Sequence, residues 1–302
     1  MGLANFNPND NGCDVDLPQP ASDGPHIGGP GDVYSAMDTK KPLSSGHQMP
    51  GAAAASAAPT RARPVGDVWR GRVDSGDWNA ITDEVNEYGG ALLPRLLDDE
   101  ETRRIRALYA AEDGTFRATI DMGRYRFGEG EYRYFNAPYP EPIERLKQAL
   151  YPHLLPIARD WWAKLGRTAI WPDTLDEWLD LCHHAGQPKS TAILLKYGTK
   201  GWNALHRDLY GDLVFPLQVV INLNQPGVDH TGGEFLLLEQ RPRAQSRGTS
   251  TLLPHGYGYV FTTRDRPVRS KRGWSAAPVR HGVSAIRSGE RHTLALVFHD
   301  AS

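Results

Sequence analysis

The sequence predicts an α+β protein in which helices come first and a barrel or jelly roll of strands follows. Between residues 65 and 190, apolar residues recur at helical spacing behind residues that favour helix starts. From residue 191 to residue 302, short runs rich in Val, Ile and Phe alternate with Gly and Pro turns. Many short strands with such turns are typical of closed or two-layered antiparallel sheets. Helices followed by strands indicate a helical buttress, residues 65–190, packed on a β-core, residues 191–302.

Residues 1–64 have a different composition, with many Gly, Pro, Ala, Ser, Asp and Asn residues and hardly any large apolar ones. Such a segment cannot bury enough surface to offset its ordering entropy, so the sequence predicts a disordered N-terminal tail. The tail lacks a basic start followed by an apolar run, and no apolar stretch of the chain approaches the length that spans a bilayer. These features predict a cytoplasmic protein without a membrane segment.

The chain has 302 residues, a formal net charge of −2 and two isolated cysteines, Cys13 and Cys182. The charge excludes a global polycation, so any contact with nucleic acid must be local. Isolated cysteines fit a reducing compartment and argue against a disulfide framework. The run Cys182-His183-His184 could suggest zinc, but no second cluster in the sequence supports it, so a helix end is the favoured interpretation.

The first two expected helices of the buttress each follow a start signal. Asp77 is an N-cap for a helix that Gly89-Gly90 ends, and residues 91–93 are expected to form a short strand. Asp98 and Glu101 form a capping box for the second helix.

Two further helices and six strands complete the expected order. Pro142 suits the first turn of a long helix that is expected to bend at Pro152 and Pro156 and then continue. Thr174 is expected to cap a shorter helix. The expected strands of the core occupy residues 192–197, 215–223, 235–238, 256–262, 281–286 and 291–299.

Two histidines and one carboxylate supply a candidate metal site. His206 and Asp208 stand two residues apart, so on extended chain their side chains point to the same side. His281 would have to arrive from another strand. This is the ligand set of a facial-triad non-haem Fe(II) site, which leaves positions open for substrates and O₂. Each motif alone is common by chance, but their conjunction in this order predicts that the three residues bind iron and form the catalytic centre.

Arg291 and Thr293 predict a second ligand of that centre. Fe(II) brings two positive charges and Asp208 removes one, so a bound 2-oxoglutarate dianion would leave a net negative site. Its keto-acid end can chelate the metal, but its far carboxylate needs a cation, preferably the planar fork of arginine. Arg291 follows His281 by ten residues, and Thr293 shares its face of the expected strand. A guanidinium and a hydroxyl could therefore clamp one carboxylate.

Several stretches of the sequence also resemble a known family. They are the motifs His206-Arg207-Asp208-Leu209-Tyr210-Gly211-Asp212, Phe215-Pro216-Leu217-Gln218, Thr231-Gly232-Gly233-Glu234-Phe235, Glu239-Gln240-Arg241-Pro242-Arg243, Gln245-Ser246-Arg247, His281-Gly282-Val283-Ser284, Arg287-Ser288-Gly289 and Phe298-His299-Asp300-Ala301. Residues 206–300 resemble the core of the Fe(II)/2-oxoglutarate dioxygenases, and residues 70–302 resemble the bacterial Oxygenase-NA group. That group is assigned, through its likeness to AlkB-type enzymes, to oxidative demethylation of damaged nucleic acid.

The resemblance implies a fold, a set of cofactors and a candidate substrate. The implied fold is a double-stranded β-helix, or jelly roll, and the implied cofactors and cosubstrates are Fe(II), 2-oxoglutarate and O₂. Methylated single-stranded nucleic acid is the candidate substrate. Tyr197 lies nine residues before His206, where a tyrosine of similar enzymes reaches 2-oxoglutarate, although a half-buried strand tyrosine is the alternative. Glu234 is expected to be structural.

Two basic stretches could contact a nucleic-acid substrate. Residues 124–135 alternate basic and aromatic side chains about a glycine turn, so they are expected to form a hairpin with rings for a base and arginines for phosphates. Residues 264–272 are expected to form a basic loop shortly before His281. The alternative is an amphipathic hairpin packed on the helices and a solvated loop. The candidate substrate contacts are Tyr125, Phe127, Tyr132, Tyr134, Arg269 and Arg272.

The sequence leaves the substrate and the oligomeric state open. The favoured function is an Fe(II)- and 2-oxoglutarate-dependent dioxygenase, an oxidoreductase that hydroxylates a C–H bond, with demethylation of methylated nucleic acid as one case. The alternative among enzymes is a hydroxylase of an amino acid, a peptide (as in prolyl hydroxylases) or a small metabolite. The alternative outside enzymes is a cupin-like metal-binding barrel, which the carboxylate clamp at Arg291 and Thr293 disfavours.

Overall fold

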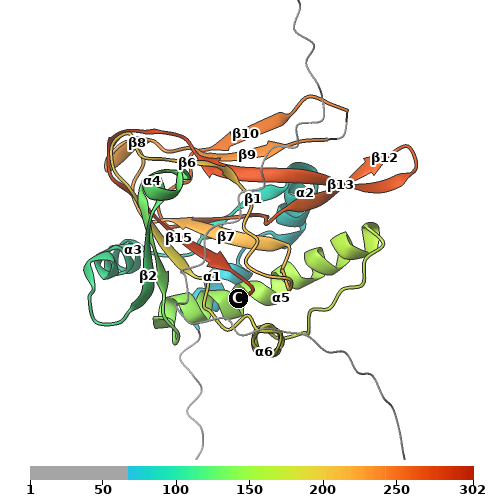
Figure 1. The fold of residues 1–302 in the computed structure, drawn as a ribbon, viewed down its shortest axis with the longest axis horizontal. Helices are drawn as coiled ribbons and strands as arrows, with labels where there is room; N and C mark the ends of the chain where they lie inside the picture. The colour runs from blue at the N-terminus through green and yellow to red at the C-terminus, as the bar shows by residue number, and fades with distance from the viewer. Residues whose placement is uncertain (1–66, 242) are drawn as a thin grey trace, which may run out of the picture. The chain divides into compact units, whose positions relative to one another are not determined.

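Two antiparallel sheets face each other in the computed structural model, which describes residues 67–241 and 243–302 (Figure 1). The first sheet orders its strands β1-β11-β7-β15-β5-β4-β2, and the second orders them β10-β9-β13-β6-β3, with β12 paired to β13. The strands β14 and β8 form a separate pair. This arrangement confirms the predicted α+β fold with a jelly-roll core. The predicted tail, residues 1–64, lies outside the described residues.

The strands are β1 (Gly90–Arg95), β2 (Phe116–Asp121), β3 (Gly128–Glu129), β4 (Glu131–Phe135), β5 (Ile193–Tyr197), β6 (Trp202–His206), β7 (Leu217–Asn222), β8 (His230–Gly232), β9 (Phe235–Glu239), β10 (Arg247–Thr251), β11 (Tyr257–Thr262), β12 (Asp265–Ser270), β13 (Gly273–Val283), β14 (Ile286–Gly289) and β15 (Arg291–Val297). The helices are α1 (Val68–Asp74), α2 (Trp78–Tyr88), α3 (Asp99–Ala107), the 3₁₀ turn η1 (Leu108–Ala110), α4 (Met122–Tyr125), α5 (Glu141–Lys164) and α6 (Leu175–His184).

The predicted helix starts are confirmed by their caps. Asp77 accepts a hydrogen bond from the backbone of Ala80 at the start of α2, and Gly89 ends that helix at φ 82°. Asp98 and Glu101 form both bonds of the capping box of α3. Thr174 caps α6. Among the described residues, no helix is long and apolar enough to cross a membrane.

One face of the first sheet packs against the helices, and the other face lines an internal cavity. This cavity, which His206, Asp208, His281 and Arg291 also line, is called the chamber below. Leu217, Val219 and Ile221 of β7 belong to the hydrophobic core that also contains the buried residues of α5. Helix α5 runs beneath β15 and β7 in Figure 1 and includes two prolines in its interior. The alternate residues Gln218 and Val220 face the second sheet and line a cavity. Because side chains of a strand alternate between faces, one strand thus supplies both the helical core and the chamber wall.

The predicted hairpin at residues 124–135 is wrong. Met122–Tyr125 form the short helix α4, which the side chain of Asp121 caps by accepting from the backbone of Gly123 at 2.9 Å. Strand β4 pairs with β2 and β5, whereas β3 pairs with β6. The aromatic and basic alternation is therefore divided between a helical cap and a sheet strand.

The predicted basic loop at residues 264–272 is also wrong. Asp265–Ser270 form β12, which pairs along its whole length with the first half of β13. Pro267 is tolerated because β12 lies at a sheet edge, where a missing backbone donor costs little. The strand that carries His281 therefore begins at Gly273, earlier than the sequence predicted.

Strands β1, β2 and β4 of the predicted buttress join the first sheet. The proposed boundary between buttress and core at residue 190 stays a prediction.

A β-bulge joins β6 to β13 beside the chamber. His281 pairs with His206, and Val283 pairs with Asn203. The interval between the two pairs is therefore three residues on β6 but only two on β13. A bulge re-aims side chains, and here Asn203 and His206 both line the cavity. Gly282 makes the close approach possible, because a Cβ at this position would lie 2.7 Å from the carbonyl oxygen of Asn203.

We expect Gly282→Ala to lower the free energy of unfolding by roughly 1–3 kcal/mol, since the added methyl must push β6 away from β13. Denaturant unfolding followed by circular dichroism measures the change. Gly248→Ala on β10 is the matched control, because a Cβ there meets its nearest atom at 4.0 Å. Equal stability of the two variants would show that the bulge tolerates a side chain.

Candidate active site

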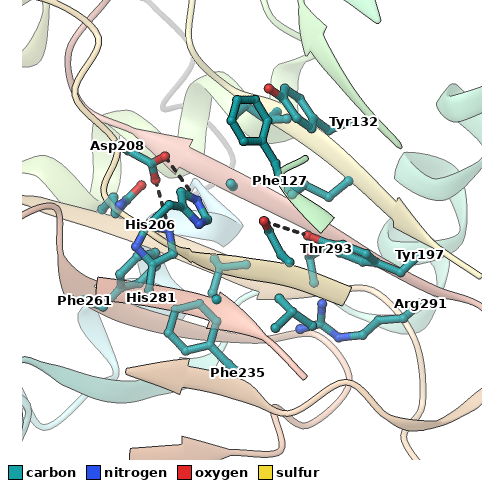
Figure 2. Close-up of a pocket in the computed structure, with 18 of the residues that line it drawn as sticks. Phe127, Tyr132, Tyr197, His206, Asp208, Phe235, Phe261, His281, Arg291 and Thr293 are labelled. Atoms are coloured by element: carbon teal, nitrogen blue, oxygen red, sulfur yellow. Dashed lines mark hydrogen bonds and ion pairs between the residues drawn. The ribbon is translucent and has the colours of Figure 1, made fainter. Parts of the chain in front are cut away.

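His206, Asp208 and His281 converge at one end of the chamber (Figure 2). His206 ends β6, Asp208 lies in the irregular segment that follows, and His281 lies in β13. Asp208 Oδ2 is 3.1 Å from His281 Nε2, and Asp208 Oδ1 is 3.5 Å from His206 Nε2. One candidate ligand atom from each residue lies within 4.8 Å of the others. The structure thus brings together all three residues that the sequence selected.

Hydrogen bonds around the triad orient its donors. His206 Nδ1 donates to the carbonyl oxygen of Ala204 at 2.7 Å, so its Nε2 keeps a lone pair that faces Asp208. Tyr210 donates its hydroxyl proton to Asp208 Oδ1 at 3.1 Å. Such outer contacts fix the tautomer and the rotamer of metal ligands. Burial alone would raise the pKa of Asp208, but the neighbouring imidazoles hold this pKa well below its usual value.

Two imidazole nitrogens and one carboxylate are a donor set that suits Fe(II) and leaves half of an octahedron open. The phenyl rings of Phe261 and Phe235 lie 4.7 and 6.0 Å from the imidazole of His281 and keep this end of the chamber apolar. His281 Nδ1 has no hydrogen-bond partner in the described part of the chain. The three residues could therefore hold the metal, with apolar walls around it.

Arg291 lies at the other end of the same cavity from the triad (Figure 2). It is 1% exposed, and neither Nη1 nor Nη2 has a hydrogen-bond partner among residues 67–241 and 243–302. Burial lowers the pKa of Arg291 to about 10, so the guanidinium still carries its charge at neutral pH. An unpartnered buried charge is costly, typically several kcal/mol. A dianion that reaches from the triad to Arg291 could bind a metal at one end of the chamber and neutralise the guanidinium at the other.

Thr293 and Tyr197 complete the wall around Arg291. Thr293 is 2% exposed and lines the cavity on the same face of β15 as Arg291. Tyr197 pairs with Arg291 across the strands, and its ring centroid is 5.8 Å from the guanidinium carbon. Its hydroxyl accepts a hydrogen bond from Asn203 at 3.2 Å and keeps a proton to donate. Burial raises the pKa of Tyr197 to about 12, so the phenol is neutral.

The predicted substrate contacts are dispersed over the structure. Phe127 and Tyr132 line the cavity, and Tyr125 stacks on Phe127 with its ring centroid at 5.8 Å. Tyr134 is 2% exposed and packs edge-on against Tyr210 behind the chamber, so it offers no face to a base.

Arg269 and Arg272 belong to the β12–β13 hairpin, and neither lines the cavity. The structure therefore brings two of the six predicted substrate residues to the chamber itself.

Among the lining residues that were not selected from the sequence, four contact predicted site residues. Phe235 and Phe261 enclose His281, Tyr210 orients Asp208, and Asn203 reaches Tyr197. The position of Tyr210, two residues after Asp208, was a signal that could have been used. The side chain of Asn203 points into the chamber because of the bulge, and no local sequence pattern predicts that bulge.

Comparison with protein families gives one matching model, which covers residues 130–301. It is Oxygenase-NA, described as "Oxygenase, catalysing oxidative methylation of damaged DNA". Two curated relatives are "Uncharacterized protein MT2286" and "Uncharacterized protein Rv2227" from Mycobacterium tuberculosis strains CDC 1551 / Oshkosh and ATCC 25618 / H37Rv. Each is 73% identical over 168 residues, which is 56% of this chain and 72% of the relative.

Two solved structures are similar at low sequence identity. A prolyl-4-hydroxylase from Pseudomonas putida is 14% identical with a TM-score of 0.47, over 74% of this chain and 99% of that chain. An oxidoreductase of the 2OG-Fe(II) oxygenase family from Burkholderia pseudomallei is 17% identical with a TM-score of 0.43, over 76% of this chain and 95% of that chain.

Alanine at His206, Asp208 or His281 should each abolish turnover and weaken Fe(II) binding while the fold is retained, because each removes one of three converging donors. Metal titration followed by calorimetry, with circular dichroism for the fold, measures both effects. His184→Ala, at the exposed end of α6, is the matched control. Wild-type iron affinity in any of the three variants would remove that residue from the site.

Proposed function

The chain belongs to the Oxygenase-NA family of Fe(II)- and 2-oxoglutarate-dependent dioxygenases, and we propose that it removes methyl groups from a nucleic-acid base by oxidation. The observation that supports the enzymatic assignment most directly is the unpartnered guanidinium of Arg291, buried in the cavity that the triad shares. A barrel that stored or sensed a metal would have no use for a second, cationic end of its chamber.

In this proposal each end of the chamber has one task. His206, Asp208 and His281 hold Fe(II), and Arg291 with Thr293 holds the far carboxylate of 2-oxoglutarate. When bound, iron and 2-oxoglutarate supply an O₂-dependent oxidation of a C–H bond, with succinate and CO₂ as coproducts. The aromatic rings of Phe127, Phe235 and Phe261 exclude water from this reaction.

A methyl group on nitrogen is a target that such a site can remove. Hydroxylation of that carbon gives a product that loses formaldehyde, so the protein needs no further catalytic group. Phe127 and Tyr132 would flank a flat base, and the Tyr132 hydroxyl is buried without a partner in the described part of the chain. A base that lies beside these rings must leave its stack, as in enzymes that act on flipped or single-stranded bases. The description of the matching family, which names damaged DNA, supports the same substrate class.

Arg291→Ala should raise the 2-oxoglutarate concentration for half-saturation about ten- to a hundredfold, since a charge-assisted contact contributes roughly 1.5–3 kcal/mol. Iron binding should hardly change, and Arg291→Lys should recover part of the loss because the fork geometry is absent. Titration of 2-oxoglutarate into the iron-loaded protein, followed by the visible charge-transfer band of the iron-bound keto acid, measures the half-saturation in both variants.

Lys196→Ala is the matched control for this variant, because Lys196 lies on the adjacent strand but is paired with Glu290 at 2.9 Å. An unchanged requirement in Arg291→Ala would mean that another cation binds the carboxylate.

A screen for substrate-stimulated succinate release decides the substrate class. Methylated single-stranded oligonucleotides should stimulate release and yield formaldehyde, whereas unmethylated oligonucleotides of the same sequence should not. Amino acids and peptides are tested beside them. Stimulation by these compounds, with no response to methylated strands at low salt, would replace demethylation with hydroxylation of a peptide or a small molecule.

A further inference from the structure

Helix α4 and strand β3 form a cap that is fastened to the strand carrying His206. Strand β3 pairs with β6, and the backbone of Ala204 donates to the carbonyl oxygen of Phe127 at 2.7 Å. A Cβ at Gly128 would lie 2.2 Å from the carbonyl oxygen of Trp202, so the two segments touch backbone to backbone. Helix α4 precedes β3 in the chain and appears next to β6 in the view of Figure 1. The outer side of this cap is thus held in a fixed relation to the metal end of the chamber.

Three large apolar side chains remain exposed on the cap and on β6. Tyr125, Trp202 and Leu205 are 40%, 43% and 39% exposed. Each stands within two positions of a residue that lines the cavity, namely Phe127, Asn203 and His206 respectively. Tyr125 and Phe127 are stacked with an interplanar angle of 17°, so a series of rings leads from the surface to the chamber. Exposed rings beside a pocket are a common feature of surfaces that stack bases.

Two arginines flank the exposed tyrosine. Arg124 and Arg126 are exposed, and neither forms an ion pair with any residue of the described ranges. The guanidinium carbon of Arg124 lies 6.0 Å from the ring centroid of Tyr125. The nearest carboxylates in sequence are Asp121, which caps α4, and Glu129, which lies opposite Trp202 on the paired strand; both also line a groove with Tyr109 and Lys196, and neither forms an ion pair with these arginines in the described ranges. The positive charge beside Tyr125 is therefore available to a polyanion.

We propose that Arg124, Tyr125, Arg126, Trp202 and Leu205, the cap surface, dock the nucleotides that flank the target base of a single-stranded nucleic acid. The proposal rests on the proposed function and adds the path of the strand outside the chamber. Tyr125 and Trp202 stack flanking bases, and Arg124 and Arg126 contact phosphates. A single strand fits better than a duplex, because the rings need unpaired bases and the target must enter a buried cavity.

The β12–β13 hairpin is the competing basic surface. Its exposed Trp274 already contacts the Lys164 ammonium and the Arg269 guanidinium, at 4.8 and 4.7 Å from the ring centroid. Arg266 at the same hairpin forms an ion pair with the buried Glu239. No residue of β12 and no residue of the hairpin tip lines the chamber, within the part of the chain that the structure describes. The hairpin is therefore farther from the chamber than the cap surface, and its Arg266 is already neutralised by Glu239.

Fluorescence anisotropy with a labelled single-stranded oligonucleotide tests the proposal on the full chain. Trp202→Ala and Tyr125→Ala should each weaken binding about five- to a hundredfold, the range expected for one stacked base. Trp202→Phe should restore much of the loss, which separates stacking from a folding defect. Arg124→Gln combined with Arg126→Gln should reduce the slope of log affinity against log salt by about 1.4, since each phosphate contact on a single strand contributes about 0.7.

Matched controls come from the competing hairpin and from α2. Trp274→Ala removes a tryptophan that is 37% exposed, Tyr88→Ala removes a tyrosine that is 46% exposed, and Arg269→Gln with Arg272→Gln removes two exposed charges. All three should bind the oligonucleotide as the wild type does. In every variant the keto-acid charge-transfer band should be unchanged, because none of these residues lines the cavity.

Two results would overturn the proposal. Loss of binding in the hairpin variants with wild-type binding in the cap variants would assign the docking to the hairpin. Absence of binding by the wild type at low salt would remove nucleic acid as the partner of this surface. In either case the charge-transfer band still reports whether the chamber binds iron and 2-oxoglutarate, so failure of the docking proposal is distinguishable from failure of the enzymatic assignment.

Discussion

The pairing of β6 with β13 is the constraint on which the candidate active site depends. It brings His206 opposite His281, and its bulge turns Asn203 and His206 into the same chamber. The pairing is tight because Gly282 leaves room for the carbonyl oxygen of Asn203. The cap is fastened to the other edge of β6, so the metal end and the proposed docking surface share one strand. A displacement of β6 would therefore disturb both.

Local signals explain why much of the helical part could be predicted. A capping box such as Asp98 with Glu101 acts over one helical turn, and the structure forms it as expected. The triad could also be selected, because a His-x-Asp pair with a distant His is a chemical pattern that does not require the fold. Arg291 was selected by charge balance at the metal, and its burial in the same cavity agrees with that reasoning.

The errors arose where strand pairing decides the structure. The alternation in residues 124–135 is compatible with a hairpin, but Asp121 caps a helical turn and β4 finds its partners in β2 and β5. Tyr134 became a core residue because it pairs with Ile193, which only the sheet order determines. The charges of residues 264–272 suggested a solvated loop, whereas β13 supplies an edge on which they form a strand. Such pairings join residues far apart in the sequence, and no local pattern encodes them.

If 2-oxoglutarate binds Arg291 as proposed, it also stabilises the folded protein. A ligand that binds the folded chain and not the unfolded chain adds RT ln(1 + [L]/Kd) to stability, about 2.7 kcal/mol at a hundredfold excess over Kd. If 2-oxoglutarate neutralises Arg291, the empty protein must carry the cost of a desolvated cation that the loaded protein does not. A cell depleted of this metabolite would then hold a larger unfolded fraction open to proteolysis. Abundance of the enzyme, and not its turnover alone, would follow the supply of 2-oxoglutarate.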